Sequence, residues 1–356
     1  MGNLNMEFDK NGKYYAYADR AVDNLLANYW DKDRNIFYDS YPKKTGSAFN
    51  YWWYAHGIDA LTDAYIRTGN KKYREYADNI LLSIVKKNGK IINDYYDDME
   101  WMALALLRLH DKTGEEKYAE YVKILWEDIK GGWNTNMGGG IAWRKSQLDY
   151  KNTPANAPAA ILAARLYRIL GDKEDFKWAK KIYDFQKENL VNNMTGQVWD
   201  GINREGNGQI DKNWIFTYCH GVYLGAGVEL YKITNDEIYI EDAKRTANYA
   251  LETFFSKSSG SFTESGEGDG GLFKGILTRY LTELYLVCPD MRGIKEKLEM
   301  CAETLYEKGT TEDGRFVRNG YSESLDDRYD LSVQISGVML YEMMAVIESA
   351  KYNNRT

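Results

Sequence analysis

The chain has 356 residues, of which 44% are hydrophobic and 28% are charged. This length exceeds the size at which one compact core usually stops growing, so two domains or one ring-shaped domain are both possible. The formal net charge of −7 argues against nucleic acids and anionic membrane surfaces as partners, because both bind clustered Lys and Arg. The 30 tyrosines and 10 tryptophans suit helix packing and sugar binding equally well.

The cysteines and the N-terminal sequence bear on the cellular compartment. Cys219, Cys288 and Cys301 include no CxxC pair and indicate buried side chains without a disulfide framework. No apolar stretch typical of a signal peptide opens the chain, and no apolar window of about 18 residues predicts a membrane span. We therefore expect a cytoplasmic protein, although a chain whose signal peptide had been removed would look the same.

The first element expected along the chain is an amphipathic helix over residues 12–30, and a repeated phrase follows it. The phrase reads DAYIRTGNKKYREYA at 63–77 and returns at 108–122, 165–179 and 229–243, with a weaker copy at 283–297. Each copy predicts an αα-hairpin, because a residue able to adopt positive φ, or a proline, ends one helix just before the next begins. The five turn positions are Gly69, Gly114, Gly171, Asn235 and Pro289.

The two helices of each hairpin differ in their surfaces. The second is amphipathic, whereas the first is apolar on nearly all sides, as at 155–170 and 214–230, which indicates burial. The last apolar segment, 331–347, can pair with the amphipathic 12–30 helix, giving six inner and six outer helices. We predict an all-α (α/α)6 toroid forming a single domain over 1–356. The alternative, an open α-solenoid, would not need matching half-hairpins at its two ends.

Six long connections lead from each outer helix to the next inner helix, and we expect all six on one face of the ring. Long loops on a rigid frame are where binding and chemistry concentrate. The connections are expected at about 31–51, 88–97, 130–153, 191–213, 256–270 and 309–329.

Asp97 and Asp98 stand at the end of one long connection, directly before an apolar helix. An N-cap explains one aspartate well and two less well, because each ionised neighbour raises the cost of ionising the other. Glycoside hydrolysis requires one ionised and one protonated carboxyl group, and adjacent side chains that splay apart could reach the roughly 5 Å separation of a retaining enzyme. A second pair, Asp326 and Asp327, has arginines nearby and fits a solvated loop better. The pattern alone does not choose among the other acids on this face, Asp149, Asp200, Glu264 and Asp269.

Five phrases resemble, in order, those of glycoside hydrolase family 76, the bacterial and fungal α-1,6-mannanases. They are YYDDMEWMALALLRL, GGGIAWRK, KNTPANAPAAILAARLY, FTYCHGVYLGA and GDGGLFKGILTRYL, and the resemblance runs from about residue 15 to 345. It implies an (α/α)6 barrel and hydrolysis of α-1,6-mannosidic linkages with retention, with Asp97 as nucleophile and Asp98 as general acid/base. The family usually has Asn and Gln where this chain has Cys219 and His220, which leaves the fine substrate preference open.

Sugar contacts are expected from aromatic and amide side chains on or beside the long connections. The candidates are Trp53, Trp143, Asn152, Asn156, Trp199, His220 and Asp269. The three histidines, His56, His110 and His220, lack metal-ligand spacing, so we expect neither a metal nor an organic cofactor.

We expect a monomer acting on an oligo- or polysaccharide of the α-mannan type. Two other functions stay open, a catalytically silent sugar-binding toroid and an (α/α)6 sugar epimerase.

Overall fold

The computed structural model describes residues 7–43, 49–258, 260–264, 266–318 and 328–353, which contain twelve α-helices and seven short strands. The chain divides into two compact units. Unit 1 comprises Met1–Ser83 and Phe254–Thr356, and unit 2 comprises Ile84–Thr253. The expected Asp326–Asp327 pair lies outside the described residues. The expectation of one domain over 1–356 stays a prediction.

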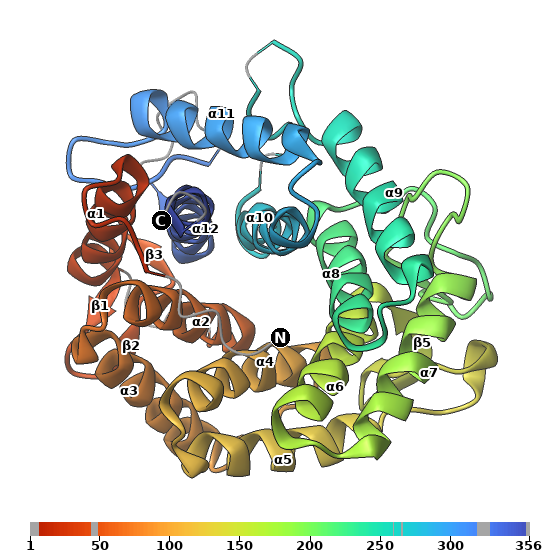
Figure 1. Cartoon of the computed structure of the whole chain (residues 1–356). Coiled ribbons are helices and arrows are strands. Elements are labelled where there is room, and N and C mark those ends of the chain that lie inside the picture. The colour runs from red at the N-terminus through yellow and green to blue at the C-terminus, as the bar shows by residue number, and fades with distance from the viewer. Residues whose placement is uncertain (1–6, 44–48, 259, 265, 319–327, 354–356) are drawn as a thin grey trace. The chain divides into compact units, whose positions relative to one another are not determined.

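In unit 2, three mostly buried helices lie side by side, each paired with an amphipathic partner (Figure 1). The buried helices are α4 (Tyr96–Thr113), α6 (Ala157–Leu170) and α8 (Thr217–Thr234), and their partners are α5 (Glu116–Lys130), α7 (Lys173–Asn189) and α9 (Glu237–Thr253). Gly114, Gly171 and Asn235 adopt the predicted left-handed conformation at the helix ends, where a side chain with Cβ is disfavoured unless it is Asn or Asp. The three hairpins expected here are therefore confirmed.

Unit 1 follows the same alternation. The described helices are α1 (Lys13–Tyr29), α2 (Tyr51–Thr68), α10 (Gly270–Val287), α11 (Arg292–Lys308) and α12 (Leu331–Asn353), together with the greater part of α3 (Lys71–Asn88), which ends in unit 2. Helix α12 contacts α1, α2, α10 and α11. Gly69 is left-handed at the end of α2, and α10 ends at Val287, two residues before Pro289, as expected.

Helix α12 corrects one expectation from the sequence. Its segment Leu331–Ala350 is long and apolar enough to cross a membrane by length and composition, and it is the one such helix in the described part of the chain. Most of this segment is buried against other parts of the protein, as in the core helix of a globular unit.

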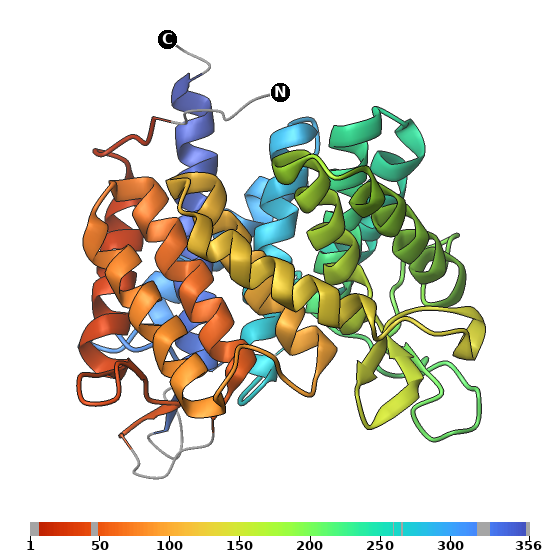
Figure 2. The ribbon, with the colours of Figure 1, turned by 90° about the horizontal axis from the view of Figure 1, so that it is seen from below.

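Short strands, which the sequence did not predict, shape the connections. Strands β4 (Ala142–Arg144), β5 (Gln147–Asn152) and β6 (Gly201–Ile202) form an antiparallel sheet in unit 2. The β4–β5 hairpin projects beyond the ends of the unit 2 helices, in yellow in Figure 2. In unit 1, β1 (Trp30–Asp31) pairs with β2 (Ile36–Phe37), and β3 (Ser40–Tyr41) pairs with β7 (Tyr329–Asp330).

Candidate active site

Asp97 and Asp98 occupy the second and third positions of α4. The N-cap residue is Tyr95, and no side chain caps this helix, so neither aspartate is the N-cap. Both side chains are partly exposed, whereas the next residue, Met99, is fully buried. Successive residues of an α-helix point about 100° apart, so the two carboxyl groups face different neighbours at the open end of the helix.

Each carboxyl group has a different set of hydrogen bonds. Asp97 Oδ1 accepts from the backbone N–H of Asp98 at 3.0 Å, and Asp97 Oδ2 accepts from the indole N–H of Trp143 at 3.1 Å. Asp98 Oδ2 accepts from the amide of Asn93 at 2.7 Å. The same Asn93 side chain accepts the backbone N–H of Asp94 and so shapes the turn that leads into α4.

The surroundings of Asp97 disfavour its charge. Burial by the surrounding protein atoms, together with the negative charge of Asp200, raises the pKa of Asp97 to about 7. The hydrogen bonds from the Asp98 amide and the Trp143 indole oppose this rise, because they stabilise the carboxylate. Asp97 therefore changes its charge near neutral pH, which is typical of a carboxyl group at a functional site.

The β4–β5 hairpin brings Trp143 to Asp97. Arg144 pairs with Tyr95 in an antiparallel bridge, and the backbone N–H of Lys145 donates to the carbonyl of Asp94 at 2.9 Å. The Trp143 ring packs on Tyr95 with centroids 5.2 Å apart, and the Arg144 guanidinium lies 4.7 Å from the Trp143 ring centroid. This packing fixes the direction of the indole N–H.

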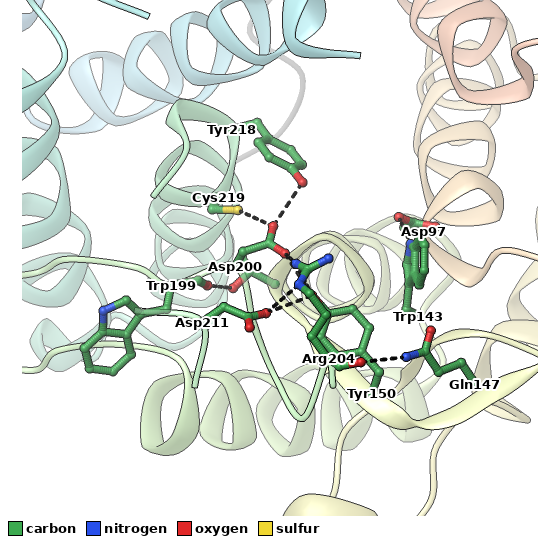
Figure 3. Close-up of polar contacts among 11 residues, drawn as sticks. Asp97, Trp143, Gln147, Tyr150, Trp199, Asp200, Arg204, Asp211, Tyr218 and Cys219 are labelled. Atoms are coloured by element: carbon green, nitrogen blue, oxygen red, sulfur yellow. Dashed lines mark hydrogen bonds and ion pairs between the residues drawn. The ribbon is translucent and has the colours of Figure 1, made fainter. Parts of the chain in front are cut away.

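A third carboxyl group, Asp200, belongs to the same site (Figure 3). It lies in the connection between α7 and α8, directly before β6, which pairs with the end of β5. Asp200 Oδ2 accepts from the hydroxyl of Tyr150 at 2.9 Å, and Oδ1 accepts from the hydroxyl of Tyr218 at 3.3 Å. Tyr150 also packs edge-on against Trp143 at 5.8 Å, which links Asp200 to the indole that holds Asp97.

Arg204 is the charge partner of Asp200. Its guanidinium pairs with Asp200 Oδ2 and with Asp211 Oδ2, the second contact at 3.0 Å. Burial raises the pKa of Asp200, whereas the Arg204 charge lowers it. The sequence placed Asp200 among the acids of this face but gave no reason to prefer it. Its chain neighbours Gly201 and Ile202 form a strand too short to be recognised in a sequence.

Glu100 is an acid that sequence reasoning missed. It is fully buried on α4, one turn after Asp97. Burial, together with the charge of Asp97, raises the pKa of Glu100 well above its usual range. A polar residue inside the apolar run MEWMALALL was the available signal.

The two asparagines predicted as sugar contacts differ in their surroundings. Asn156 is fully buried, and its side chain donates to and accepts from the backbone of Ile141 at 3.0 and 2.8 Å. It also donates to the carbonyl of Asn152, so it ties the 130–156 connection to the start of α6. Asn152 is 4% exposed, and its Oδ1 has no hydrogen-bond partner among the described residues.

His220 is occupied by contacts with the backbone. Its Nε2 accepts the N–H of Val198 at 3.0 Å, and its Nδ1 lies 2.8 Å from the carbonyl of Phe216 and so carries the proton. The ring is fully buried and stacks on Tyr249. Burial lowers the pKa of His220 to about 4, so the ring is neutral at neutral pH. Its neighbour Cys219 places its thiol 3.6 Å from Asp200 Oδ1.

The remaining predicted contacts lie elsewhere. The indole of Trp199 points away from Asp97 in Figure 3. Trp53 and Asp269 belong to unit 1, where the indole N–H groups of Trp52 and Trp53 donate to one oxygen of Asp269 at 3.0 and 2.9 Å. In the part of the chain that the structure describes, no group of three or more His, Cys, Asp or Glu could hold a metal ion.

The sequence of residues 13–355 matches the profile of Glycosyl hydrolase family 76. The chain belongs to this family and is a glycoside hydrolase. It is similar to the α-1,6-mannanase of Salegentibacter sp. HEL1_6, with 39% identity, a TM-score of 0.88, and coverage of 94% of this chain and 100% of the other. A likeness of this extent to family 76 structures, which are (α/α)6 toroids, confirms the fold predicted from the repeats.

A variant of the same enzyme and one further relative bear on the chemistry. A variant of the Salegentibacter mannanase, inactivated by replacing two consecutive aspartates, is known in complex with an α-1,6-mannotetraose at 38% identity and a TM-score of 0.89, with coverage of 94% of this chain and 100% of the other. A Schizosaccharomyces pombe protein, a putative mannan endo-1,6-α-mannosidase, is 26% identical, with coverage of 94% of this chain and 81% of the relative.

The same comparisons show that the expectation of a cytoplasmic location is wrong. Curated relatives such as the DCW1 and DFG5 proteins of Saccharomyces cerevisiae are named for their action on mannan, a polymer of the cell wall outside the cytoplasm. A glycan as binding partner is supported by the mannooligosaccharide complexes of homologues, whereas the monomeric state stays a prediction.

Proposed function

We propose that this family 76 enzyme cleaves α-1,6-mannosidic linkages of mannan-type glycans by double displacement at Asp97 and Asp98. The observation that carries this proposal is the adjacent aspartate pair at the open end of α4, one member of which has a pKa of about 7. The relative that loses activity when two consecutive aspartates are replaced supports the same assignment.

In the first step, the Asp97 carboxylate attacks the anomeric carbon and forms a glycosyl-enzyme ester. Asp98 donates a proton to the oxygen of the departing sugar. In the second step, Asp98 takes a proton from water, which attacks the anomeric carbon and releases Asp97. Two inversions at one carbon give net retention.

The hydrogen bonds of Asp97 fit the role of nucleophile. The N–H groups of Asp98 and Trp143 each bind one carboxylate oxygen, and both stabilise the ionised form that attacks. Because burial raises its pKa to about 7, Asp97 is fully ionised only above that pH in the free enzyme. Desolvation of this kind keeps the carboxylate reactive, since fewer water molecules shield it.

Several side chains are proposed to hold the sugar. Asp200 faces the site with its charge balanced by Arg204, and we assign it to hydroxyl groups of the sugar that reacts at Asp97. Trp143 and Asn152 stay proposed contacts in unit 2, and Trp53 and Asp269 stay proposed contacts in unit 1. The second oxygen of Asp269 has no hydrogen-bond partner among the described residues and could accept a hydroxyl. We do not propose Asn156 and His220 as sugar contacts, because their buried side chains hydrogen-bond to the backbone. We do not propose Trp199, because its indole points away from Asp97.

The test is hydrolysis of linear α-1,6-mannan by the wild type, Asp97→Ala and Asp98→Ala, with Asp94→Ala as control. Asp94 is an exposed aspartate three residues before the pair. We expect loss of all measurable activity in Asp97→Ala, a loss of about 10²–10⁴-fold in Asp98→Ala, and none in the control. Activity close to wild type in both pair variants would return the aspartates to a structural role at the helix end.

Azide separates the two roles. With an activated α-mannoside, Asp98→Ala still forms the glycosyl-enzyme, because a good leaving group needs little protonation. Azide should then give the α-mannosyl azide from this variant. A β-azide from Asp98→Ala would make Asp98 the nucleophile and reverse the assignment.

A further inference from the structure

Trp214 is the most exposed tryptophan among the described residues, with 46% of its surface accessible. It lies in the connection between α7 and α8, the same connection that carries Asp200. An exposed tryptophan is unusual, because its large apolar surface is normally buried in folded proteins. The exposed part of the indole is available to pack against a ligand.

The position of Trp214 is fixed by contacts on several sides. Its backbone N–H donates to the carbonyl of Asp211 at 2.9 Å, and its carbonyl accepts the N–H of Asp200 at 3.1 Å. The Arg204 guanidinium lies 3.8 Å from the indole centroid, and the Phe216 ring stands edge-on at 5.9 Å. An aromatic ring held in this way loses little conformational entropy when a ligand packs against it.

Arg204 connects Trp214 to the reacting groups. Its guanidinium pairs with the Asp200 carboxylate and also stacks on the Trp214 indole, so the indole and that carboxylate share a single charged group. Asp200 is in turn close enough to Asp97 to raise its pKa. Successive interactions thus join Asp97, Asp200, Arg204 and Trp214 within unit 2.

We propose that Trp214 is the platform of a further sugar subsite, which binds an α-1,6-linked mannose unit next to the one contacted by Asp200. The C–H face of a pyranose ring can pack on an indole, while the sugar hydroxyls stay in water. Arg204 orients the platform from the side of the indole that it covers. This inference rests on the proposed function. It adds that Trp214 makes the enzyme bind longer α-1,6-mannooligosaccharides more tightly than shorter ones.

The test measures binding separately from catalysis. The parent protein carries Asp97→Ala and Asp98→Ala, which should remove hydrolysis, and it is titrated calorimetrically with α-1,6-mannobiose and α-1,6-mannotetraose. Trp214→Ala in this parent should weaken tetraose binding about tenfold, which corresponds to about 1.4 kcal/mol. The loss for mannobiose should be at least threefold smaller than the loss for the tetraose. Trp214→Phe, which keeps an aromatic face, should recover part of the tetraose affinity.

A matched control and two outcomes decide the inference. Ile238→Ala removes a side chain that is 52% exposed on α9 and should leave both affinities as in the parent. Equal tetraose affinity with and without Trp214 would overturn the platform. Equal losses for both sugars would also overturn it, because they would place Trp214 in support of Arg204 and Asp200. A parent that binds neither sugar would refute the proposed function itself, and the platform with it.

Discussion

At the scale of single residues, Asp97 is a carboxyl group whose surroundings work against its charge. Burial raises its pKa to about 7, while the indole N–H of Trp143 and the backbone N–H of Asp98 resist that rise. A nucleophile must be ionised, so these opposing effects set the pH at which the enzyme becomes active. They also affect folding, because a carboxylate that has lost part of its hydration destabilises the folded state.

Trp143→Phe should move the acidic limb of the pH–rate profile upward. The substitution keeps an aromatic ring but removes the donor to Asp97 Oδ2, and loss of a hydrogen bond to the ionised form raises the pKa. We expect kcat/KM against pH to shift by on the order of one pH unit, with most of the loss below pH 7. An acidic limb that stays in place, or moves to lower pH, would contradict the role of this hydrogen bond.

Asp97→Asn should stabilise the protein in alkaline solution. The pKa of Asp97 is raised in the folded state above its value in the unfolded chain, so its contribution to stability is lost as the pH rises toward and through 7. An amide of similar shape does not ionise. Urea unfolding should give a higher free energy of unfolding for the variant than for wild type at pH 8 and little difference at pH 4. A variant that is less stable at pH 8 would show that the carboxylate is well solvated.

At the scale of elements, the helices and their turns could be predicted from the sequence, and the hairpin could not. The glycines at 69, 114 and 171 mark helix ends because the left-handed conformation there costs a residue with Cβ free energy. The apolar periodicity separated inner from outer helices because it follows burial directly. Strands β4 and β5 have only two residues between them, Lys145 and Ser146, without the glycine that usually signals such a turn. The hairpin that directs Trp143 toward Asp97 was therefore missed.

The candidate site was predicted in part for the same reason. Asp97 and Asp98 stand out in the sequence because two acids stand side by side directly before an apolar run. Asp200, Tyr150 and Arg204 come from connections whose path depends on the three-stranded sheet, and sequence spacing does not show that they meet. From the sequence, His220 and Asn156 are candidate sugar contacts, Asn156 because an amide suits sugar hydroxyls. In the structure the polar atoms of both side chains hydrogen-bond to the backbone.

His220 joins two elements and should be replaceable by glutamine. Its ring accepts from Val198 in the connection before Asp200 and donates to Phe216 at the start of α8. A glutamine amide offers one acceptor and donors in similar positions. His220→Ala should lower the free energy of unfolding by about 2–4 kcal/mol, because it leaves buried backbone groups unpaired and a cavity beside Tyr249. His220→Gln should recover most of the stability and of kcat/KM.

The measurements are urea unfolding and hydrolysis of mannan for both His220 variants. If His220→Ala is as stable and active as wild type, the two hydrogen bonds do not position the connection. If glutamine does no better than alanine, ring stacking on Tyr249 is the essential contact instead.

At the scale of the whole molecule, the composition argued against a nucleic-acid-binding protein, and the repeats predicted the fold. Neither gave the location, since the N-terminal sequence suggested a cytoplasmic protein and the mannan-acting relatives contradict it. The substrate could be inferred only through the family resemblance. A net charge of −7 and an abundance of aromatic residues are shared by many proteins that bind no sugar.

The expected independence from metals is testable on the whole enzyme. An acid pair of this kind needs no metal ion for a double displacement. Dialysis against a chelator should leave the rate of mannan hydrolysis unchanged. Loss of activity that one divalent cation restores would disprove this expectation.

The measurement that tests the double displacement most directly is a proton NMR time course of linear α-1,6-mannan hydrolysis by the wild-type enzyme. Retention predicts that the reducing ends appear first as the α anomer, and that the β anomer grows in later at the rate of mutarotation. Asp97→Ala should show neither signal over the same time. If the β anomer appears first, water attacks the linkage directly, and Asp97 does not form a covalent intermediate.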